Sequence, residues 1–422
     1  MPAQGGVGAL WLPLMGKAQP DQCGHDTRGP GEARPRGKRD TMALAPGKTY
    51  QIVNKRSNLA LTPKSWSTGP STVDQYDIQA SGAGSAISQT WHLFPMDGND
   101  YLLVNKRGGM ALTPEYWSTG PSGLDQYHIQ REDKRPHQLW NLVDRGSGWY
   151  QIINKASGLA ITPERWSGGR SAVDVYYAQQ PGDANFDSQL WKFQLVDTYR
   201  PVTDLQPVPW PADGVGDVIR LTGHTMPEPA RTPEVLIGQV AVPFGVQDGG
   251  GSADQQAQHN PYLILKQYGY WERVFYYEHS GLSQYEEKQR TTIGLTTSNR
   301  TEVERTTSIS VTAEAGFVFK GFSAGISTTV TDQLRVLRAT EETETSEKED
   351  IVTRTYFVGD RVTEALWYRG DHFVLQRMDG SQVAEWRTRD KRSSVLDGWP
   401  RAGDAASWPE RGDDETAKTW PE

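Results

Sequence analysis

The chain has 422 residues, a single cysteine and a formal net charge of −8. This length exceeds one ordinary domain and predicts two or three folding units. The negative charge argues against a nucleic-acid partner, the lone cysteine excludes intramolecular disulfides and cysteine-based zinc clusters, and no run approaches the eighteen apolar residues of a transmembrane helix.

The first 41 residues are rich in Gly, Pro and charged side chains, most clearly over residues 28–36. Such a composition buries too little apolar surface to fold, so we expect residues 1–41 to form a disordered N-terminal extension. A weakly apolar patch over residues 7–15 contains Pro13 and lacks a charged segment before it, so we find no clear signal peptide. An alternative is that the natural chain starts at Met42.

A segment of the form Tyr-x-x-(Val/Ile)-Asn-Lys occurs three times, from Tyr50, Tyr101 and Tyr150. The spacings are 101 − 50 = 51 and 150 − 101 = 49 residues, and a period near 50 indicates an array of one supersecondary unit. A unit this short cannot bury its own apolar face, so we expect the three copies to share one core over residues 42–198. Short aromatic and β-branched runs between Pro, Gly and Ser clusters predict strands. Each copy ends on Gln-x-Trp, at Gln89/Trp91, Gln138/Trp140 and Gln189/Trp191.

Each repeat also carries one tryptophan, one aspartate and one tyrosine at matching positions. A sugar presents an apolar C–H face to a ring and hydroxyl groups to a carboxylate, so this set suits carbohydrate binding. The alternative is that the aromatic residues fill the core of each lobe and recur only through duplication. We assign that core role to the Gln-x-Trp tryptophans and leave both roles open for the others. The candidate carbohydrate-binding residues are Trp66, Asp74 and Tyr76, then Trp117, Asp125 and Tyr127, then Trp166, Asp174 and Tyr176.

The second half of the chain predicts another all-β unit. Residues 199–234, with prolines at 201, 207, 209 and 211, predict a stiff linker. Residues 235–398 alternate Thr/Ser-rich runs with aromatic ones and predict a β-domain, and residues 399–422 predict a flexible tail. The acidic run over residues 341–350 predicts a solvated strand edge.

Residues 309–330 alternate apolar and small polar side chains, which predicts β-strands. We expect Lys320–Gly321 to form a two-residue hairpin turn, with the Thr/Ser-rich flanks at 291–307 and 328–346 extending the same strands. Two strands of roughly 11 residues with one apolar face match a membrane-spanning hairpin. The alternative is a half-buried hairpin in a soluble β-domain. The candidate membrane-insertion residues are Ile309, Val311, Phe317, Phe319, Phe322, Ile326 and Val330.

The three units ending in Gln-x-Trp resemble the ricin-B-type β-trefoil lectin domain. A trefoil followed by a Ser/Thr-rich β-domain with one amphipathic hairpin resembles the aerolysin-like pore-forming toxins, and residues 316–327 resemble the C-terminal domain of binary insecticidal crystal toxins. The resemblance implies an all-β chain with an N-terminal β-trefoil and an elongated aerolysin-like β-domain. It implies a soluble protein, released or secreted to act at a target-cell membrane. The implied partners are a cell-surface glycan, target membrane lipid, a homo-oligomer on the membrane and, for the binary type, a second toxin component.

One departure from the lectin pattern affects the expected sugar sites. In ricin-like lobes an aspartate just after the apolar pair of the first loop usually binds the sugar, whereas this chain has Thr62, Thr113 and Thr162 there. The third repeat departs further, with Val175 and the Gly-Gly-Arg stretch 168–170. The resemblance therefore places sugar sites in the first two lobes.

The histidines are scattered without metal-ligand spacing, and the sequence contains no nucleophile elbow, phosphate-binding loop or paired-carboxylate motif. We therefore expect no metal, no cofactor, no catalytic residue and no enzyme activity. The function that we expect is a glycan-targeted β-pore-forming toxin of the insecticidal type. The alternatives are a non-pore-forming lectin or adhesion protein and, less favoured, a hydrolase with a trefoil accessory domain.

Overall fold

The computed structural model describes residues 47–401, except for 81, 97–98, 131–133, 199–204, 245, 250, 294–296, 312–316, 320–329, 331 and 335–347. The predicted N-terminal extension and most of the predicted C-terminal tail lie outside the described residues. None of the helices among the described residues is long and apolar enough to cross a membrane.

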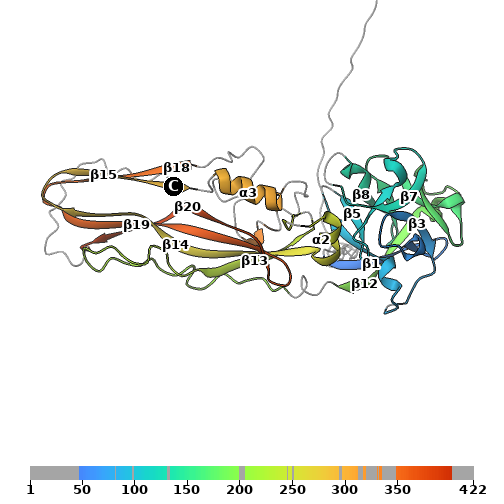
Figure 1. The fold of residues 1–422 in the computed structure, drawn as a ribbon, viewed down its shortest axis with the longest axis horizontal. Coiled ribbons are helices and arrows are strands. Elements are labelled where there is room, and N and C mark those ends of the chain that lie inside the picture. Colours follow the sequence, from blue (N-terminus) through green and yellow to red (C-terminus); the bar gives the residue numbers. More distant parts are fainter. Residues whose placement is uncertain are drawn as a thin grey trace, which may run out of the picture. The chain divides into compact units, whose positions relative to one another are not determined.

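Residues 48–198 form twelve strands in three lobes of four, drawn from blue to green in Figure 1. Six of the strands pair in a closed ring, in the order β1, β4, β5, β8, β9 and β12, and the last strand pairs with the first. The other six form three hairpins, β2–β3, β6–β7 and β10–β11. Strands β3, β7 and β11 also pair with one another, which closes one end of the ring. The strands are β1 (Lys48–Asn54), β2 (Ala60–Pro63), β3 (Ser71–Tyr76), β4 (Thr90–Pro95), β5 (Asp100–Asn105), β6 (Ala111–Pro114), β7 (Ser122–Tyr127), β8 (Leu139–Asp144), β9 (Tyr150–Asn154), β10 (Ala160–Pro163), β11 (Ser171–Tyr176) and β12 (Leu190–Thr198).

The Gln-x-Trp motif explains why each repeat folds in the same way. In the first lobe the Gln89 amide nitrogen donates to the Thr62 hydroxyl at 2.9 Å, and its carbonyl oxygen accepts the backbone N–H of Gln79 at 2.8 Å. Trp91 is fully buried and its indole N–H donates to the Leu61 carbonyl at 3.2 Å. Each of these buried polar groups therefore has a partner, and the hydrogen bond offsets the cost of removing the group from water. The same contacts recur around Gln138 with Trp140 and around Gln189 with Trp191.

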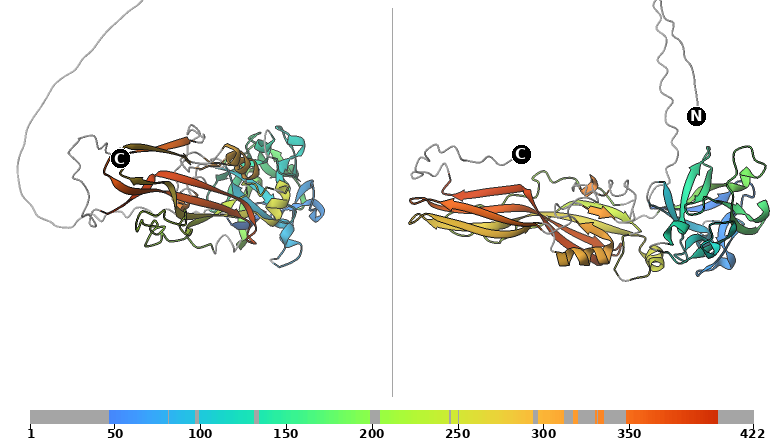
Figure 2. Two further views of the ribbon diagram at one scale, coloured as in Figure 1. Left: turned by 60° about the vertical axis from the view of Figure 1, so that its left-hand side comes forward. Right: turned by 90° about the horizontal axis from the view of Figure 1, so that it is seen from above.

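The second half contains a four-stranded antiparallel sheet in the order β13, β14, β19, β20. Figures 1 and 2 show its long strands in yellow to red. A separate two-stranded sheet, β15 and β18, packs over one end, where Val352 contacts Phe275, Leu366 and Tyr368. The strands are β13 (Val235–Pro243), β14 (Tyr262–Ser280), β15 (Tyr285–Ile293), β18 (Lys348–Tyr356), β19 (Arg361–Gln376) and β20 (Gln382–Trp399), with the short helix α2 (Ala253–His259) between β13 and β14.

Part of the predicted linker packs against this sheet. Val218 and Leu221 are buried against Ala365 and Trp367 of β19. The backbone N–H of Leu221 also donates to the Asp397 carboxylate. Residues near Leu221 therefore cover one face of the sheet in addition to connecting the two halves.

The region between β15 and β18 differs from the sequence prediction. Residues Thr297–Thr307 form the helix α3 rather than an extension of a strand, and β16 (Ile309–Val311) pairs with β17 (Phe317–Phe319). Ile309 lies opposite Phe319 and Val311 opposite Phe317, so the two strands run in opposite directions. The prediction of one continuous strand from 309 to 319 is therefore wrong. Alternation of apolar and polar residues assigns the two faces of a strand. Ile309, Val311, Phe317 and Phe319 share one face both in a continuous strand and in the observed β16–β17 pair. The alternation therefore could not show where the chain reverses.

The predicted second strand of the hairpin is also partly wrong. Val330 and residues 332–334 are helical, so the strand does not continue to Val330. Phe322, Ile326 and the predicted Lys320–Gly321 turn lie outside the described residues.

Candidate functional site

Each lobe of the trefoil presents its tryptophan on a strained loop. Trp66 ends the 3-10 turn η1 (Lys64–Trp66), and both Ser65 and Trp66 have positive φ, at 54° and 61°. A non-glycine residue in this region costs on the order of 1–2 kcal/mol, so it persists only where the surroundings enforce it. The same conformation recurs at Tyr116 with Trp117 and at Arg165 with Trp166, in η3 (Glu115–Trp117) and η5 (Glu164–Trp166). The remaining 3-10 turns are η2 (Ala86–Gln89), η4 (Arg135–Gln138) and η6 (Phe186–Gln189).

The predicted tryptophan, aspartate and tyrosine come together in every lobe. The rings of Trp66 and Tyr76 meet edge to face, with centroids 5.4 Å apart. Asp74 and Tyr76 are two residues apart on β3 and therefore share one face of that strand, while Gln75 between them is fully buried. The equivalent pairs Trp117–Tyr127 and Trp166–Tyr176 are each 5.5 Å apart.

The three aspartates are half-buried, and burial raises the pKa of each. For Asp74 the nearby Lys64 ammonium partly opposes this rise in pKa. For Asp125 burial and then the Glu115 carboxylate raise the pKa to about 6, and for Asp174 burial, Glu164 and Glu115 also raise the pKa to about 6. One carboxylate oxygen of Asp125 is buried and has no hydrogen-bond partner among the described residues. Because this oxygen is buried, a ligand could reach it only if the neighbouring side chains moved.

The threonines that replace the usual sugar-binding aspartate have a structural role. Thr62 is buried, and its hydroxyl donates to the Ala60 carbonyl at 2.8 Å while accepting from Gln89. Thr113 and Thr162 make the equivalent contacts. A ligand could reach none of these hydroxyls without opening the lobe.

Two glutamines that sequence reasoning did not select connect neighbouring lobes. The Gln126 amide nitrogen donates to the carbonyls of Ser67 and Gly69 at 3.1 and 2.6 Å, and thereby holds the loop after Trp66. Gln75 holds the loop after Trp166 in the same way, with carbonyl contacts at 3.1 and 2.6 Å. The third lobe has Val175 at this position, fully buried.

The Val175 side chain has no hydrogen-bond donor. Among the described residues, no side chain of a neighbouring lobe supplies the missing contact to the loop after Trp117. The only sequence signal was the change from Asp-Gln-Tyr to Asp-Val-Tyr in the third repeat. The second lobe therefore has the least restrained tryptophan loop.

The surroundings of the three aromatic pairs also differ. In the first lobe the Arg170 guanidinium lies 4.1 Å from the Tyr76 ring centroid and pairs with Asp77, so it covers one face of that ring. In the second lobe the Trp117 ring has His137 at 6.2 Å and the Lys134 ammonium at 5.9 Å. The faces available to a ligand thus differ between lobes.

The predicted membrane-insertion residues lie partly in the core of the second half. Ile309 and Val311 are buried by the four-stranded sheet, together with Val330. Phe317 and Phe319 lie on β17 directly opposite them. In this structure Ile309, Val311 and Val330 therefore face the protein interior, as the alternative of a soluble β-domain also requires.

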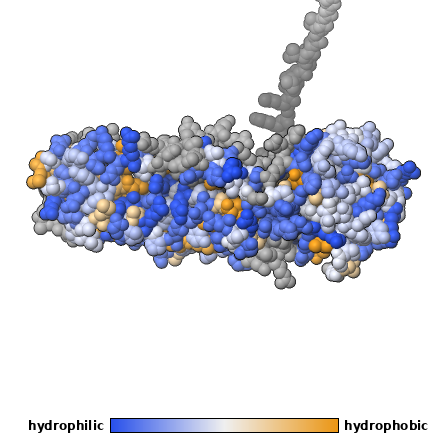
Figure 3. All heavy atoms as spheres, viewed as in Figure 1, coloured by the Kyte–Doolittle hydropathy of each residue, from blue (hydrophilic) through white to orange (hydrophobic). Residues whose placement is uncertain are grey.

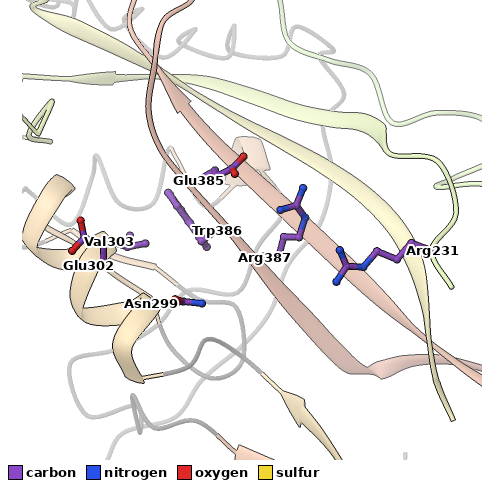
Figure 4. Close-up of a pocket in the computed structure, with 7 residues that line it drawn as sticks. All are labelled: Arg231, Asn299, Glu302, Val303, Glu385, Trp386 and Arg387. Carbon is purple, nitrogen blue, oxygen red and sulfur yellow. The ribbon is translucent and has the colours of Figure 1, made fainter.

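A cavity of about 360 Å³ lies between α3 and β20. Figure 4 shows Asn299, Glu302 and Val303 on the helix and Glu385, Trp386 and Arg387 on the strand, with Trp386 toward the helix and Arg231 at one side. Of the helix residues, Val303 is the apolar one that joins the core. The helix therefore rests on the sheet through little apolar contact.

Among the described residues, no group of three or more His, Cys, Asp or Glu side chains could hold a metal ion. The described sites are thus built from aromatic rings, single carboxylates and apolar strands.

Comparisons with known proteins agree with this division. Residues 235–401 match the family described as Insecticidal Crystal Toxin, P42, and residues 88–176 match the ricin-type β-trefoil lectin domain-like family. No curated protein matches the chain.

Among solved structures, the chain is similar to Cry35Ab1, with 17% identity over 85% of this chain and 92% of that one and a TM-score of 0.63. This likeness shows a shared fold. The chain is also similar to the designed three-fold symmetric protein ThreeFoil, with 32% identity over 35% of this chain and 98% of that one and a TM-score of 0.30. It is similar to a mosquitocidal holotoxin as well, with 20% identity over 36% of this chain and 18% of that one and a TM-score of 0.30. Along the chain, a region that matches the ricin-type β-trefoil lectin domain-like family is thus followed by one that matches the Insecticidal Crystal Toxin, P42, family.

Proposed function

We propose that this protein is a glycan-targeted β-pore-forming toxin without enzymatic activity. In this proposal the trefoil binds a cell-surface carbohydrate through its Trp, Asp and Tyr sets. The C-terminal domain then oligomerises on the membrane and inserts a hairpin from each chain into a shared barrel.

The observation that carries the proposal is the position of the segment between β15 and β18. These strands are already paired, from Tyr285 opposite Tyr356 to Ile293 opposite Lys348. The intervening residues 294–347 number 347 − 293 = 54, and they leave and rejoin the sheet at adjacent positions. If extended, they would form two strands of about 27 residues, each about 90 Å long at about 3.3 Å per residue. This length exceeds the roughly 30 Å hydrocarbon core of a bilayer.

The described part of the segment is held on the sheet by five buried apolar side chains. Val303, Ile309, Val311, Val330 and Leu334 are buried there, and exposing each costs about 1.5–3 kcal/mol, or about 8–15 kcal/mol together. The cavity between α3 and β20 reduces the area over which α3 contacts the sheet. Burial of the same apolar residues against lipid would offset this cost.

Insertion requires several chains. A single hairpin in hydrocarbon has two open edges, and each unpaired backbone group there costs several kcal/mol. Closed barrels of this type have at least about eight strands, so two strands per chain require at least about four chains.

The test is a reversible tether between α3 and the rest of its domain. An ideal Cβ at Gly249 would lie 2.9 Å from the Thr306 methyl carbon, within reach of a disulfide. We expect the Gly249→Cys/Thr306→Cys protein, with Cys23→Ser to remove the other thiol, to bind glycan but not to release dye from receptor-bearing vesicles until it is reduced. The matched controls are the two single-cysteine variants, which should release dye at the same rate before and after reduction.

If the oxidised tether permeabilises vesicles as fast as the reduced form, pore formation by this segment is refuted. The non-pore-forming lectin or adhesion protein would then take its place. If the wild type binds no glycan on an array, the carbohydrate-targeting part of the proposal fails for the sugars tested.

A further inference from the structure

Two turns at one end of the toxin domain carry exposed apolar side chains. The turn between β14 and β15 exposes Leu282 to 86%, and the turn between β18 and β19 exposes Phe357 to 57% and Val358 to 69%. Tyr285, at the start of β15, is 45% exposed. This end of the domain lies at the far left of Figure 1, next to the label of β15, and Figure 3 shows apolar side chains there. Large apolar side chains at such exposure favour a partner that removes them from water.

The two turns are hydrogen-bonded to each other although 357 − 282 = 75 residues separate Leu282 from Phe357 in sequence. The Gly359 backbone N–H donates to the Gly281 carbonyl at 2.9 Å, and the His279 ring lies 3.1 Å from the Phe357 carbonyl oxygen. Gly281 has φ of +79°, and a Cβ there would lie 3.3 Å from backbone atoms of the opposite turn. The glycine thus allows the two turns to approach and to present their apolar side chains side by side.

A stack of tyrosines lies directly behind the turns. Tyr277 stacks on Tyr285 at 5.3 Å and on Tyr356 at 5.1 Å, and His279 stacks on Tyr356 at 5.2 Å. Leu282, Phe357 and Val358 thus lie at the turns, and the tyrosines lie next to them toward the body of the domain. This order is the one found where a protein enters a bilayer, because tyrosine rings favour the interface between hydrocarbon and headgroups.

We infer that this tip, defined as Leu282, Tyr285, Phe357 and Val358, is a lipid-contacting surface that partitions into the bilayer interface. The size of the tip favours lipid over a protein partner, because a stable protein interface buries about 800 Å² on each side, more than four side chains on two turns provide. A fluid bilayer accepts a narrow apolar tip without a matching surface.

The charges beside the tip indicate which lipid it fits. Glu278, Glu286, Lys288 and Arg361 are exposed near it, Asp360 is half-buried, and the Lys288 ammonium pairs with Glu286 at 2.7 Å. Three acids against two bases give no basic patch for anionic headgroups. The partner is therefore a zwitterionic bilayer, bound through apolar contact and with little dependence on salt. This inference deepens the proposed function, since it names a lipid contact for a protein proposed to act at membranes.

The test uses sedimentation with glycan-free phosphatidylcholine vesicles. We expect the wild-type protein to bind, Leu282→Asp and Val358→Asp each to lower the partition coefficient at least about tenfold, and high salt to change it less than twofold. The matched control is Leu195→Asp on the trefoil, where an exposed leucine (48%) lies outside the tip. It should bind vesicles like the wild type.

A probe on the tip reports its environment directly. Leu282→Cys in a Cys23→Ser background, labelled with a polarity-sensitive fluorophore, should brighten and shift to the blue on these vesicles. The same label at Leu195→Cys should not change. Unchanged fluorescence at position 282 on bound protein, or wild-type vesicle binding by Leu282→Asp, would overturn the inference.

Two further outcomes separate this inference from the proposed function. If Leu282→Asp alters self-association in solution but leaves vesicle binding intact, the tip is a contact between copies and the lipid assignment is refuted. If the wild type releases dye from receptor-bearing vesicles while the probe at 282 stays in water, pore formation stands and the tip inference fails. If the probe enters the bilayer but the tethered protein releases dye without reduction, the tip inference stands and the proposed insertion segment fails.

Discussion

Replacing Gln126 by valine tests the contact that holds the first lobe's tryptophan loop. The side chain is fully buried, and its amide nitrogen donates to the carbonyls of Ser67 and Gly69. Each such bond contributes about 0.5–1.5 kcal/mol net, so losing both costs about 1–3 kcal/mol. The side-chain oxygen of Gln126 is buried without a partner among the described residues, so removing it recovers part of that cost. We therefore expect a net loss of about 1–2 kcal/mol.

The chain supplies its own comparisons. Valine is sterically compatible with this site, because Val175 occupies the matching position in the third lobe and is fully buried. Gln75 makes the two carbonyl contacts and also bonds the hydroxyls of Ser171 and Ser57, at 3.2 and 2.7 Å. Gln75→Val should therefore destabilise the trefoil more than Gln126→Val, with a total loss of about 2–6 kcal/mol if all four bonds count.

Hydrogen exchange and denaturant unfolding measure this effect. Amides in the loop at residues 67–69 should exchange about 5- to 30-fold faster in Gln126→Val, which corresponds to about 1–2 kcal/mol. The loop after Trp117, which has no glutamine contact, should exchange faster than its two counterparts already in the wild type. Equal stability of Gln126→Val and wild type, or a larger loss for Gln126→Val than for Gln75→Val, would refute this reasoning.

Three further predictions concern charge and function. The pKa of Asp125 is raised to about 6, mainly by burial and then by Glu115, so its ionisation opposes folding, and wild-type stability should fall as pH rises from about 4 through 6. Asp125→Asn should show a smaller fall, because Asp174, whose pKa is also raised to about 6, keeps its own contribution; equal pH profiles of unfolding would contradict this prediction. Combined Asp74→Ala and Asp125→Ala should abolish binding on a glycan array with little change in thermal midpoint, and unaltered binding would disprove this assignment of the sugar sites. Phe317→Lys should block dye release but not glycan binding, because a lysine facing lipid near the midplane costs about 2–4 kcal/mol; Ser310→Lys, on the other parity, should still release dye.

The repeats made the trefoil predictable from sequence. The three Gln-x-Trp motifs each form a local network, in which Gln89 and Trp91 bond only groups of their own lobe. Because these contacts are short-range and recur three times, spacing and residue type were sufficient to identify the unit. The pairing of each loop tryptophan with its tyrosine was likewise expected from the repeat. Whether these rings bind sugar is still a prediction.

The tertiary structure decided the features that depend on long-range contacts. Alternation over residues 309–330 identified apolar faces, but the sheet that buries Ile309 determines where the chain reverses, and α3 formed in a Thr-rich stretch that was expected to be strand. The Gln126 contact joins two lobes, with 57 residues between donor and acceptor along the chain. The turns that carry Leu282 and Val358 meet only because the β14–β15 turn lies beside the β18–β19 turn. Sequence patterns report the faces of single segments, whereas register and the meeting of distant turns follow from how all strands share one sheet.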